Sequence, residues 1–243
     1  MNKRVFLASM TAVLMAACAA FSAETISFSG YTWVVRPSGR GGPGPNNWEP
    51  DNVSVDAKGY LHLRLTQREG KWYGSEVYTQ KRLGFGRYEF WLTGPVDKLD
   101  RNVVLGLFNY PTRDVGPDAT HEIDIEFAQW GNSSAPSGNY TVWPATNSLR
   151  RESEAFAYTL NGDTTRHGFT WTSTNVVFES REERGVDGTR PLATWAFQPT
   201  NPAACISQKT MPVHINLWCF RGKPPNDGKE VELIVRAFKF TPP

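Results

Sequence analysis

Three acidic residues alternate with apolar ones in residues 122–127 of this 243-residue chain. Glu122, Asp124 and Glu126 are each followed by an isoleucine or a phenylalanine. Because successive side chains of a β-strand point to opposite faces, this spacing predicts one strand that carries all three acids on one face and its apolar residues on the other.

Three like charges on one strand face repel one another and are costly to desolvate, so we expect the cluster to have an oppositely charged partner or a function. One interpretation is a solvated edge strand whose acids face lysine or arginine on a neighbouring strand. A second is a site for a hard cation such as Ca²⁺, although such sites usually add loop carbonyls. A third is glycosidic bond chemistry, which needs one carboxylate as nucleophile and one carboxylic acid as proton donor, about 5–5.5 Å apart when configuration is retained.

The spacing alone permits the glycosidic interpretation only if the strand is curved. On a flat strand, the Cα atoms of Glu122 and Glu126 are about 13 Å apart. A concave strand would bring the two side chains together. Asp124 lies between them and can form a hydrogen bond with either glutamate, which would keep the two protonation states unequal.

The acidic segment resembles a known signature. Residues 122–127 resemble the ExDxE motif of glycoside hydrolase family 16, in the form that the bacterial lichenases carry. Four further segments are similar to strands of this family and occur in the expected order: Ser75–Tyr78, Leu83–Phe90, Arg166–Trp171 and Ile215–Trp218. Two departures stand out, because His121 replaces the usual aspartate of lichenases and Phe169 stands where the family commonly has a tyrosine. The resemblance covers roughly residues 25 to 243.

The resemblance implies an all-β fold, a β-jelly-roll sandwich of two antiparallel sheets with a concave substrate cleft. It implies an endo-acting, retaining hydrolase of β-linked polysaccharide, with β-1,3-glucan or mixed-linkage β-1,3-1,4-glucan favoured. Glu122 would attack the anomeric carbon, Glu126 would serve as general acid and base, and Asp124 would tune the pair. Two other functions stay open: a transglycosylase that uses the same glutamates, and a lectin-like binding module without turnover.

Sugar binding in a cleft needs flat apolar platforms and polar groups for hydroxyls. The expected substrate-binding residues are Glu76, Tyr110, His121, Trp130, Trp143, Asn216 and Trp218. Trp218 and Glu76 match positions of the family, and Asn216 shares a strand face with Trp218. The alternatives are core or rim packing for the other aromatic residues, a salt bridge for Glu76, a strand-capping hydrogen bond for Asn216 and a structural hydrogen bond for His121.

Short alternating segments separated by Gly, Pro, Asn and Asp predict strands along most of the chain. These segments are 60–66, 74–80, 86–92, 103–110, 122–128, 140–143, 213–218 and 230–240. Loops are expected at 37–50, 97–102, 112–120 and 131–138. No internal repeat or long helical period is found, so we expect a single domain over residues 23–243.

The first 22 residues have the parts of an export signal. Lys3 and Arg4 precede an apolar run, and small residues follow it up to position 22. The alternative is a lipoprotein signal that ends before Cys18. A membrane-spanning helix needs about 20 apolar residues, and no later apolar run is nearly that long. We therefore expect a secreted or periplasmic protein, or one anchored by a lipid on Cys18.

Cysteine count and charge complete the expectations. Removal of the signal leaves Cys205 and Cys219 in an oxidising compartment, which predicts a disulfide. The formal net charge is +2 and basic residues are spread along the chain, which argues against nucleic-acid binding and favours a neutral glycan. We expect a monomer that needs no cofactor or catalytic metal, while the resemblance allows a structural Ca²⁺ on the face opposite the cleft.

Overall fold

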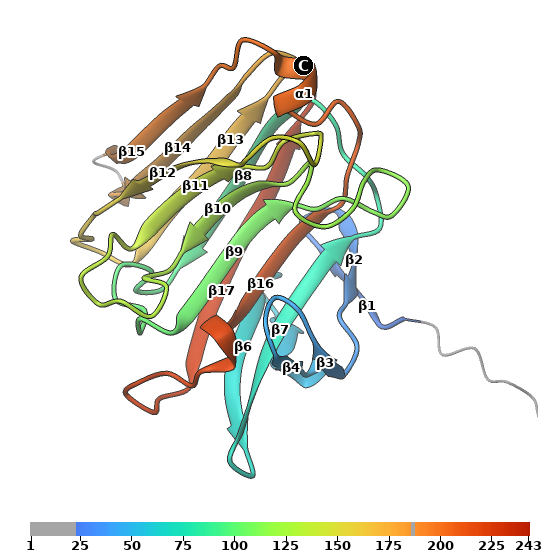
Figure 1. Ribbon diagram of the computed structural model, residues 1–243. Coiled ribbons are helices and arrows are strands. Elements are labelled where there is room, and N and C mark those ends of the chain that lie inside the picture. Colours follow the sequence, from blue (N-terminus) through green and yellow to red (C-terminus); the bar gives the residue numbers. More distant parts are fainter. Residues whose placement is uncertain (1–22, 186–187) are drawn as a thin grey trace, which may run out of the picture.

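The computed structural model describes residues 23–185 and 188–243, which form two stacked β-sheets (Figure 1). The expected signal peptide and Cys18 lie outside the described residues. Sheet A consists, in spatial order, of β12 (Glu152–Phe156), β11 (Gly138–Val142), β10 (Ile123–Phe127), β9 (Val103–Asn109), β16 (Val213–Cys219), β7 (Lys71–Thr79), β2 (Tyr31–Val35) and β1 (Thr25–Phe28). Sheet C consists of β15 (Thr189–Phe197), β14 (Val176–Glu183), β13 (Thr164–Trp171), β8 (Gly86–Thr93), β17 (Val231–Thr241), β6 (Leu61–Arg68) and β5 (Val53–Val55).

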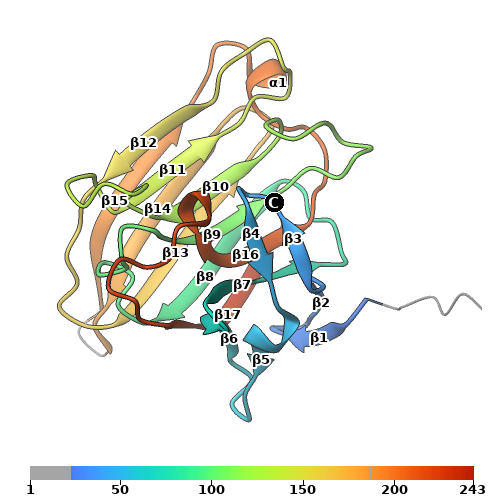
Figure 2. The same ribbon diagram turned by 60° about the horizontal axis from the view of Figure 1, so that its bottom comes forward.

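The two sheets are connected at one end of the molecule. Strands β6 and β7 pair as a hairpin there, and the short strands β3 (Gly39–Gly41) and β4 (Asn46–Trp48) lie beside it (Figure 2). Strand β4 runs parallel to β7, and the other described pairings are antiparallel. The helical elements are short: η1 (Pro50–Asn52), α1 (Pro202–Cys205) and η3 (Phe220–Gly222). No helix in the described part of the chain is long and apolar enough to cross a membrane.

The core lies between the two sheets. Strand β10 contributes Ile123, Ile125 and Phe127, which are fully buried, as their alternation with the acids predicts. Aromatic side chains from both sheets meet in the same layer, for example Tyr140 of β11 stacked on Phe178 of β14 with ring centroids 4.8 Å apart. Since apolar burial on one face of sheet A fixes its register, the acids must lie on the face turned away from sheet C.

His167, from the segment that resembles a family strand, lies in this core. Its Nδ1 is 2.8 Å from Ser180 Oγ, which also accepts a 2.7 Å hydrogen bond from the Tyr140 hydroxyl. Burial lowers the pKa of His167 to about 3, so the imidazole is neutral. The bond from Tyr140 to Ser180 links the two sheets, and His167 joins it from sheet C, so this histidine is not part of the acidic face.

The predicted all-β sandwich is confirmed, and the eight predicted strand segments correspond to β6, β7, β8, β9, β10, β11, β16 and β17 within a few residues. The segment Pro37–Pro50 was expected to be a loop, which is wrong in part because it contains β3 and β4. In this segment β4 pairs with β7, and the Asn46 side chain forms hydrogen bonds with the backbone of Cys219. Contacts with distant parts of the chain therefore determine the structure of this Gly- and Pro-rich segment.

The predicted disulfide is wrong, because Cys205 and Cys219 are both free thiols. Cys205 lies in α1, before β16 begins, and Cys219 ends that strand. A strand rises about 3.3 Å per residue, so β16 holds the two ends about 20 Å apart, and Figure 1 shows α1 and the end of β16 at well separated places. A disulfide needs Cα atoms within about 7 Å of each other.

Thiol titration will check this correction. We expect the folded domain without residues 1–22 to contain two free thiols, of which the partly exposed Cys205 reacts first. Cys219 is 1 % exposed and should react only on unfolding. A reducing agent should leave the melting temperature unchanged, and a mass two units lower than that of the dithiol would contradict the assignment.

Candidate active site

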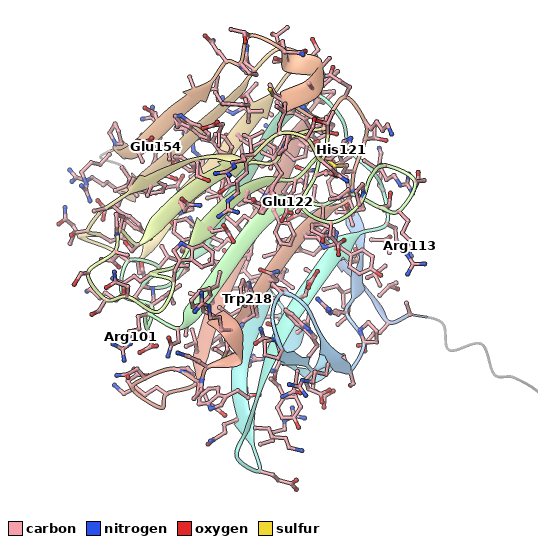
Figure 3. The ribbon with its side chains drawn as sticks, viewed as in Figure 1. Arg101, Arg113, His121, Glu122, Glu154 and Trp218 are labelled. Carbon is pink, nitrogen blue, oxygen red and sulfur yellow. The ribbon has the colours of Figure 1, made fainter. Side chains whose placement is uncertain are left out.

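The acids of β10 lie in two cross-strand rows on the outer face of sheet A, the face turned away from sheet C. In one row, Asp124 pairs with Thr141 and Phe108, and the row continues over His214 to Tyr78. In the second row, Glu126 pairs with Asn139 and Gly106, and the row continues over Asn216 to Glu76. Glu122 immediately precedes β10, and its carbonyl accepts a 2.8 Å bond from the Trp143 amide. Figure 3 shows Glu122 and Trp218 on this face.

Burial differs among the three acids. Asp124 is 4 % exposed, whereas Glu122 and Glu126 keep partial access to solvent. Burial is the main cause that raises the pKa of both Glu122 and Glu126 to about 8, and neighbouring carboxylates raise it further. Burial and the charge of Glu122 raise the pKa of Asp124 well above its ordinary value.

Asp124 distinguishes the two glutamates. A hydrogen bond between Asp124 and Glu122 lowers the pKa of Glu122 and raises that of Asp124, so the shared proton stays on Asp124. Trp143 Nε1 donates a 2.9 Å bond to Asp124 Oδ2 and holds this side chain in place. Glu126 has a different partner, the side chain of Asn139. Both glutamate pKa values are raised to about 8, but only Glu122 has a hydrogen bond with a neighbouring carboxyl group, which makes it the better candidate for the ionised member of the pair.

Glu76 lies at the far end of the second row, held by Arg36 and His214. Arg36 Nη1 donates a 2.6 Å bond to Glu76 Oε2, and His214 Nδ1 lies 2.9 Å from Oε1. Burial raises the pKa of Glu76, but His214 and Arg36 outweigh it and hold the pKa below its ordinary value. Both carboxylate oxygens thus have partners, so the salt-bridge alternative describes this residue, and His214 presents its imidazole to the outer face.

Asn216 has an orphaned oxygen in the cross-strand row that contains Glu126. The residue is 3 % exposed, and its Oδ1 has no hydrogen-bond partner among the described residues. The oxygen lies above Gly106, where a Cβ atom would come within 2.6 Å of it. A buried acceptor without a donor is costly, and a ligand hydroxyl over the second row would satisfy it.

Gly106→Ala tests whether this space is used. The added methyl group should push the Asn216 amide away from its place above residue 106, because 2.6 Å is too short for a carbon–oxygen contact. We expect KM for a glycan substrate to rise about tenfold, with a change in melting temperature of only a few degrees. Ala155→Ser, on the exposed strand β12 at the margin of the same sheet, serves as the control. Unchanged kinetics of Gly106→Ala would contradict this role of Asn216.

The aromatic residues divide into two groups along the face. Trp218 is 7 % exposed and packs with Trp48 and Val104, and partly buried Trp130 and Phe220 cover this cluster. The rings of Trp130 and Phe220 meet edge to face at 5.5 Å. These five residues form a continuous apolar area on the β9 and β16 side of the acids.

Tyr110 and His121 lie toward the other end of the acidic segment. Tyr110 is within reach of Asp118 and Glu122, and burial together with these charges raises the pKa of its hydroxyl above the ordinary value. His121 is 7 % exposed and has a left-handed backbone with φ of 63°. Its Nδ1 lies 2.9 Å from Thr120 Oγ1. Its contact is structural, which matches the alternative given for it above.

No group of three or more histidine, cysteine, aspartate or glutamate side chains in residues 23–185 and 188–243 is arranged to hold a metal ion. Glu122 and Asp124 are hydrogen-bonded to each other and Glu126 to Asn139, and carboxyl groups placed in this way can take part in acid–base and nucleophilic catalysis.

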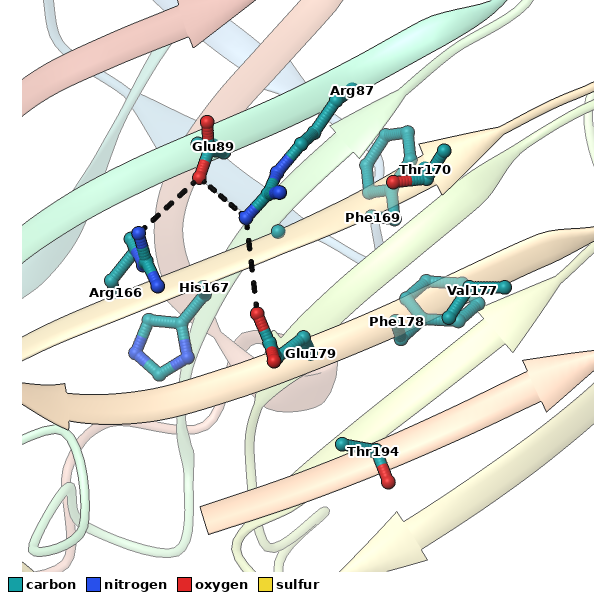
Figure 4. A pocket seen from close by; sticks show the side chains of 11 residues that line it. Arg87, Glu89, Arg166, His167, Phe169, Thr170, Val177, Phe178, Glu179 and Thr194 are labelled. Atoms are coloured by element: carbon teal, nitrogen blue, oxygen red, sulfur yellow. Dashed lines mark ion pairs between the residues drawn. The ribbon is translucent and has the colours of Figure 1, made fainter. Parts of the chain in front are cut away.

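A hollow on the outer face of sheet C is unrelated to these acids. It is about 220 Å³ in volume and lies above Gly168. Figure 4 shows its charged residues paired with one another: Arg87 is 2.9 Å from Glu89 and 3.9 Å from Glu179, and Arg166 is 3.5 Å from Glu89. These charges satisfy one another and need no ligand.

Sequence reasoning missed several residues of the site. His214 shares a strand face with Asn216 and Trp218, so the two-residue period could have identified it. Asn139 could have been found only from the register of β11. Arg151, whose guanidinium carbon lies 4.7 Å from the centre of the Trp143 ring, comes from a loop and carries no such signal.

Comparison of the structure with solved structures shows the same fold in several glucanases. A β-glucanase of Bacillus licheniformis is 20 % identical and covers 87 % of this chain and 92 % of its own, with a TM-score of 0.63. A prokaryotic β-1,3-1,4-glucanase (lichenase) from a mouse hindgut metagenome is 18 % identical and covers 92 % of this chain and 100 % of its own, also with a TM-score of 0.63. The fold that the sequence resemblance implies is therefore confirmed.

The same fold occurs in a protein of different description. An immunostimulatory antigen and pseudo β-1,3-glucanase of Mycobacterium tuberculosis is 20 % identical, with a TM-score of 0.62, and covers 87 % of this chain and 91 % of its own. No protein-family model matches the chain, and no curated protein matches it either. Since fold does not determine activity, function has to be argued from the site itself.

Proposed function

We propose that this chain is a family 16 glycoside hydrolase, an endo-acting retaining enzyme that cleaves β-linked polysaccharide, with β-1,3- or mixed-linkage β-1,3-1,4-glucan as the backbone. The observation that carries the proposal is the acidic strand face: two partly accessible glutamates on either side of a buried aspartate that hydrogen-bonds to one of them. The glucanases of the same fold support it.

The proposed reaction uses two steps. Glu122, favoured as carboxylate by its hydrogen bond with Asp124, attacks the anomeric carbon while Glu126 protonates the departing sugar oxygen. This yields a covalent glycosyl–enzyme and an ionised Glu126. Glu126 then takes a proton from incoming water, which attacks the anomeric carbon and releases Glu122. Carboxyl groups of the chain supply all the acid–base chemistry, so the proposal needs no cofactor.

The remaining predicted residues have supporting roles in this proposal. Trp218 and Trp130 offer apolar surface to sugar rings. Asn216 accepts a bond from a sugar hydroxyl, Trp143 holds Asp124, and Tyr110 lies beside the nucleophile. Glu76 is engaged by Arg36 and His214, so we propose that it positions the His214 imidazole toward the substrate.

Incubation of the purified chain with neutral β-glucans, with new reducing ends as the readout, tests the proposal. Hydrolysis by the wild type that disappears in Glu126→Gln supports it. Release of longer oligosaccharides from an oligosaccharide donor would indicate transglycosylation at the same site. Glycan binding without any turnover would identify a binding module and overturn the proposal.

The pH dependence gives a further prediction. Activity needs Glu126 protonated, and burial raises its pKa to about 8. The value of kcat/KM should therefore be highest near pH 8 and fall on both sides, above it as Glu126 loses its proton in the free enzyme and below it as Glu122, whose pKa is also raised to about 8, gains one. A profile on a glucan substrate from pH 4 to 10 checks this, and a constant kcat/KM up to pH 10 would rule out Glu126 as the acid.

We also propose that the protein acts outside the cytoplasm, as a monomer. The support is the export-signal pattern of residues 1–22 and the size of a polysaccharide substrate, which is cut before uptake. Fractionation of cells that express the full chain, followed by N-terminal sequencing of the product, tests this and separates free secretion from attachment through Cys18.

A further inference from the structure

A hollow of about 640 Å³ opens on the outer face of sheet A, beside β11 and β12. One wall contains Asp118, and the other contains Trp143, Arg150, Arg151 and Leu149. The loop that joins β11 to β12 supplies most of this lining, so the hollow lies on the side of the acids opposite to Trp218.

The hollow is linked to Asp124 through Trp143. Trp143 lines it and donates a 2.9 Å bond to Asp124. The guanidinium of Arg151 lies over the ring of the same tryptophan, 4.7 Å from its centre. Burial raises the pKa of Asp124 and of Glu126, and the charge of Arg151 opposes both rises. A ligand in the hollow would therefore be separated from Asp124 by the Trp143 side chain.

The two arginines of the hollow have no acidic partner. Both are exposed, and no carboxylate within the described ranges lies at ion-pair distance from Arg150 or Arg151. The hollow on sheet C is the contrast, because Arg87 and Arg166 are paired there with Glu89. Arg150 and Arg151 bring two positive charges to the lining of the hollow against the one negative charge of Asp118, so an incoming anion would meet a net positive charge.

Apolar and polar surfaces accompany the charges. Leu149, one of the two exposed large hydrophobic residues of the described chain, is 44 % exposed and lines the hollow. Trp143 adds an aromatic surface, and Ser153 adds a hydroxyl. A sugar ring presents the same combination, with an apolar face and polar edges.

We propose that this hollow binds an anionic group of the glycan, so that the substrate is an acidic β-linked polysaccharide that carries carboxylate or sulfate groups. The proposal rests on the proposed function and specifies its substrate class. The spread of charges along the sequence favours a neutral glycan, but the fold gathers Arg150 and Arg151 at one end of the cleft. Guanidinium groups bind carboxylate and sulfate oxygens through paired, charge-assisted hydrogen bonds.

The experiment compares one glucan in three forms: unmodified laminarin, lightly carboxymethylated laminarin and lightly sulfated laminarin. The readout is kcat/KM for each form at low ionic strength. For the wild type, we expect one charged form to exceed the neutral form by about 10- to 100-fold, the effect of one to two charge-assisted hydrogen bonds. The two charged forms distinguish carboxylate from sulfate as the group that is recognised.

Arg150→Gln/Arg151→Gln should bring the ratio of charged to neutral kcat/KM close to one. Arg151→Lys should give an intermediate ratio, because lysine keeps the charge but loses the paired geometry. The control is Lys58→Gln/Lys71→Gln, which removes the same charge from two exposed positions, one in the turn between β5 and β6 and one at the start of β7. This control should keep the wild-type ratio.

The outcomes separate this inference from the proposed function. Hydrolysis of all three forms with equal kcat/KM, or a ratio that both double variants lower alike, overturns the anionic site and leaves the hydrolase intact. If no form is cut, the hydrolase fails, and calorimetric titration of the same three glycans decides the inference. Tighter binding of a charged form that the Arg150→Gln/Arg151→Gln variant alone loses supports it, and equal binding overturns it.

Discussion

Glu122→Ala and Glu126→Ala should each lower kcat on a β-linked glycan by about 10³-fold or more, and sodium azide should distinguish the two. In Glu122→Ala, azide fills the space of the missing carboxylate and attacks the anomeric carbon directly, which gives an α-glycosyl azide. In Glu126→Ala, the covalent intermediate still forms from a substrate with a good leaving group, and azide then attacks it to give a β-glycosyl azide. Product anomers are assigned by NMR spectroscopy.

The control for this experiment is Glu154→Ala. Glu154 is an exposed acid on β12 of the same sheet, at the margin of the face that Figure 3 shows, and pairs in register with Tyr140. Its removal should change kcat less than about twofold. The same azide anomer from both glutamate variants would contradict the assignment of roles, and a full loss in Glu154→Ala would point to a folding defect.

Glu122→Gln and Glu126→Gln should make the protein more stable in alkali. In the wild type, burial raises the pKa values of Glu122 and Glu126 from 4.5 to about 8. A group whose pKa is raised in the folded state contributes stability that is complete below the unfolded pKa, near 4.5, and is lost as the pH rises through about 8. Glutamine stays neutral, so each variant should exceed the wild type by roughly 1–3 kcal/mol at pH 9 and differ little at pH 4.

Urea unfolding at pH 4, 7 and 9 measures this difference. Glu182→Gln provides a control of opposite sign. Burial raises the pKa of Glu182, but the bonds from Arg190, Gly162 and Asn161 prevail and lower it to about 2. This carboxylate contributes stability above the unfolded pKa, so its loss should destabilise the protein at pH 7 and 9. Equal stability of the Glu122 and Glu126 variants and the wild type at pH 9 would contradict the raised pKa values.

The sequence predicts strands where apolar residues alternate strictly, and it fails where the buried face is polar. Strand β10 is the clearest success, because burial of Ile123, Ile125 and Phe127 determines which face of the strand is turned to the core. Strand β14 is not identified, since its inward positions include Ser180 and Glu182, both 1 % exposed or less. These two residues are satisfied by hydrogen bonds from other strands and loops, which no local pattern contains.

The candidate site shows the same division. The acids of one strand follow from a two-residue period. The two-residue period cannot identify residues that strand register or a loop brings near the acids. Asn139, Arg36 and Arg151 are examples. The disulfide was predicted from cysteine count and compartment, and it failed because the length of β16 separates the two thiols.

The two cross-strand rows also limit how specificity can change. Neighbouring strands are about 4.8 Å apart, close to the length of one sugar unit, so a glycan that lies along a row would meet a new strand with each monosaccharide. One outward residue on one strand would then govern one position of the chain. Recognition of oligosaccharides could be altered unit by unit, by substitutions that leave the hydrophobic layer beneath untouched.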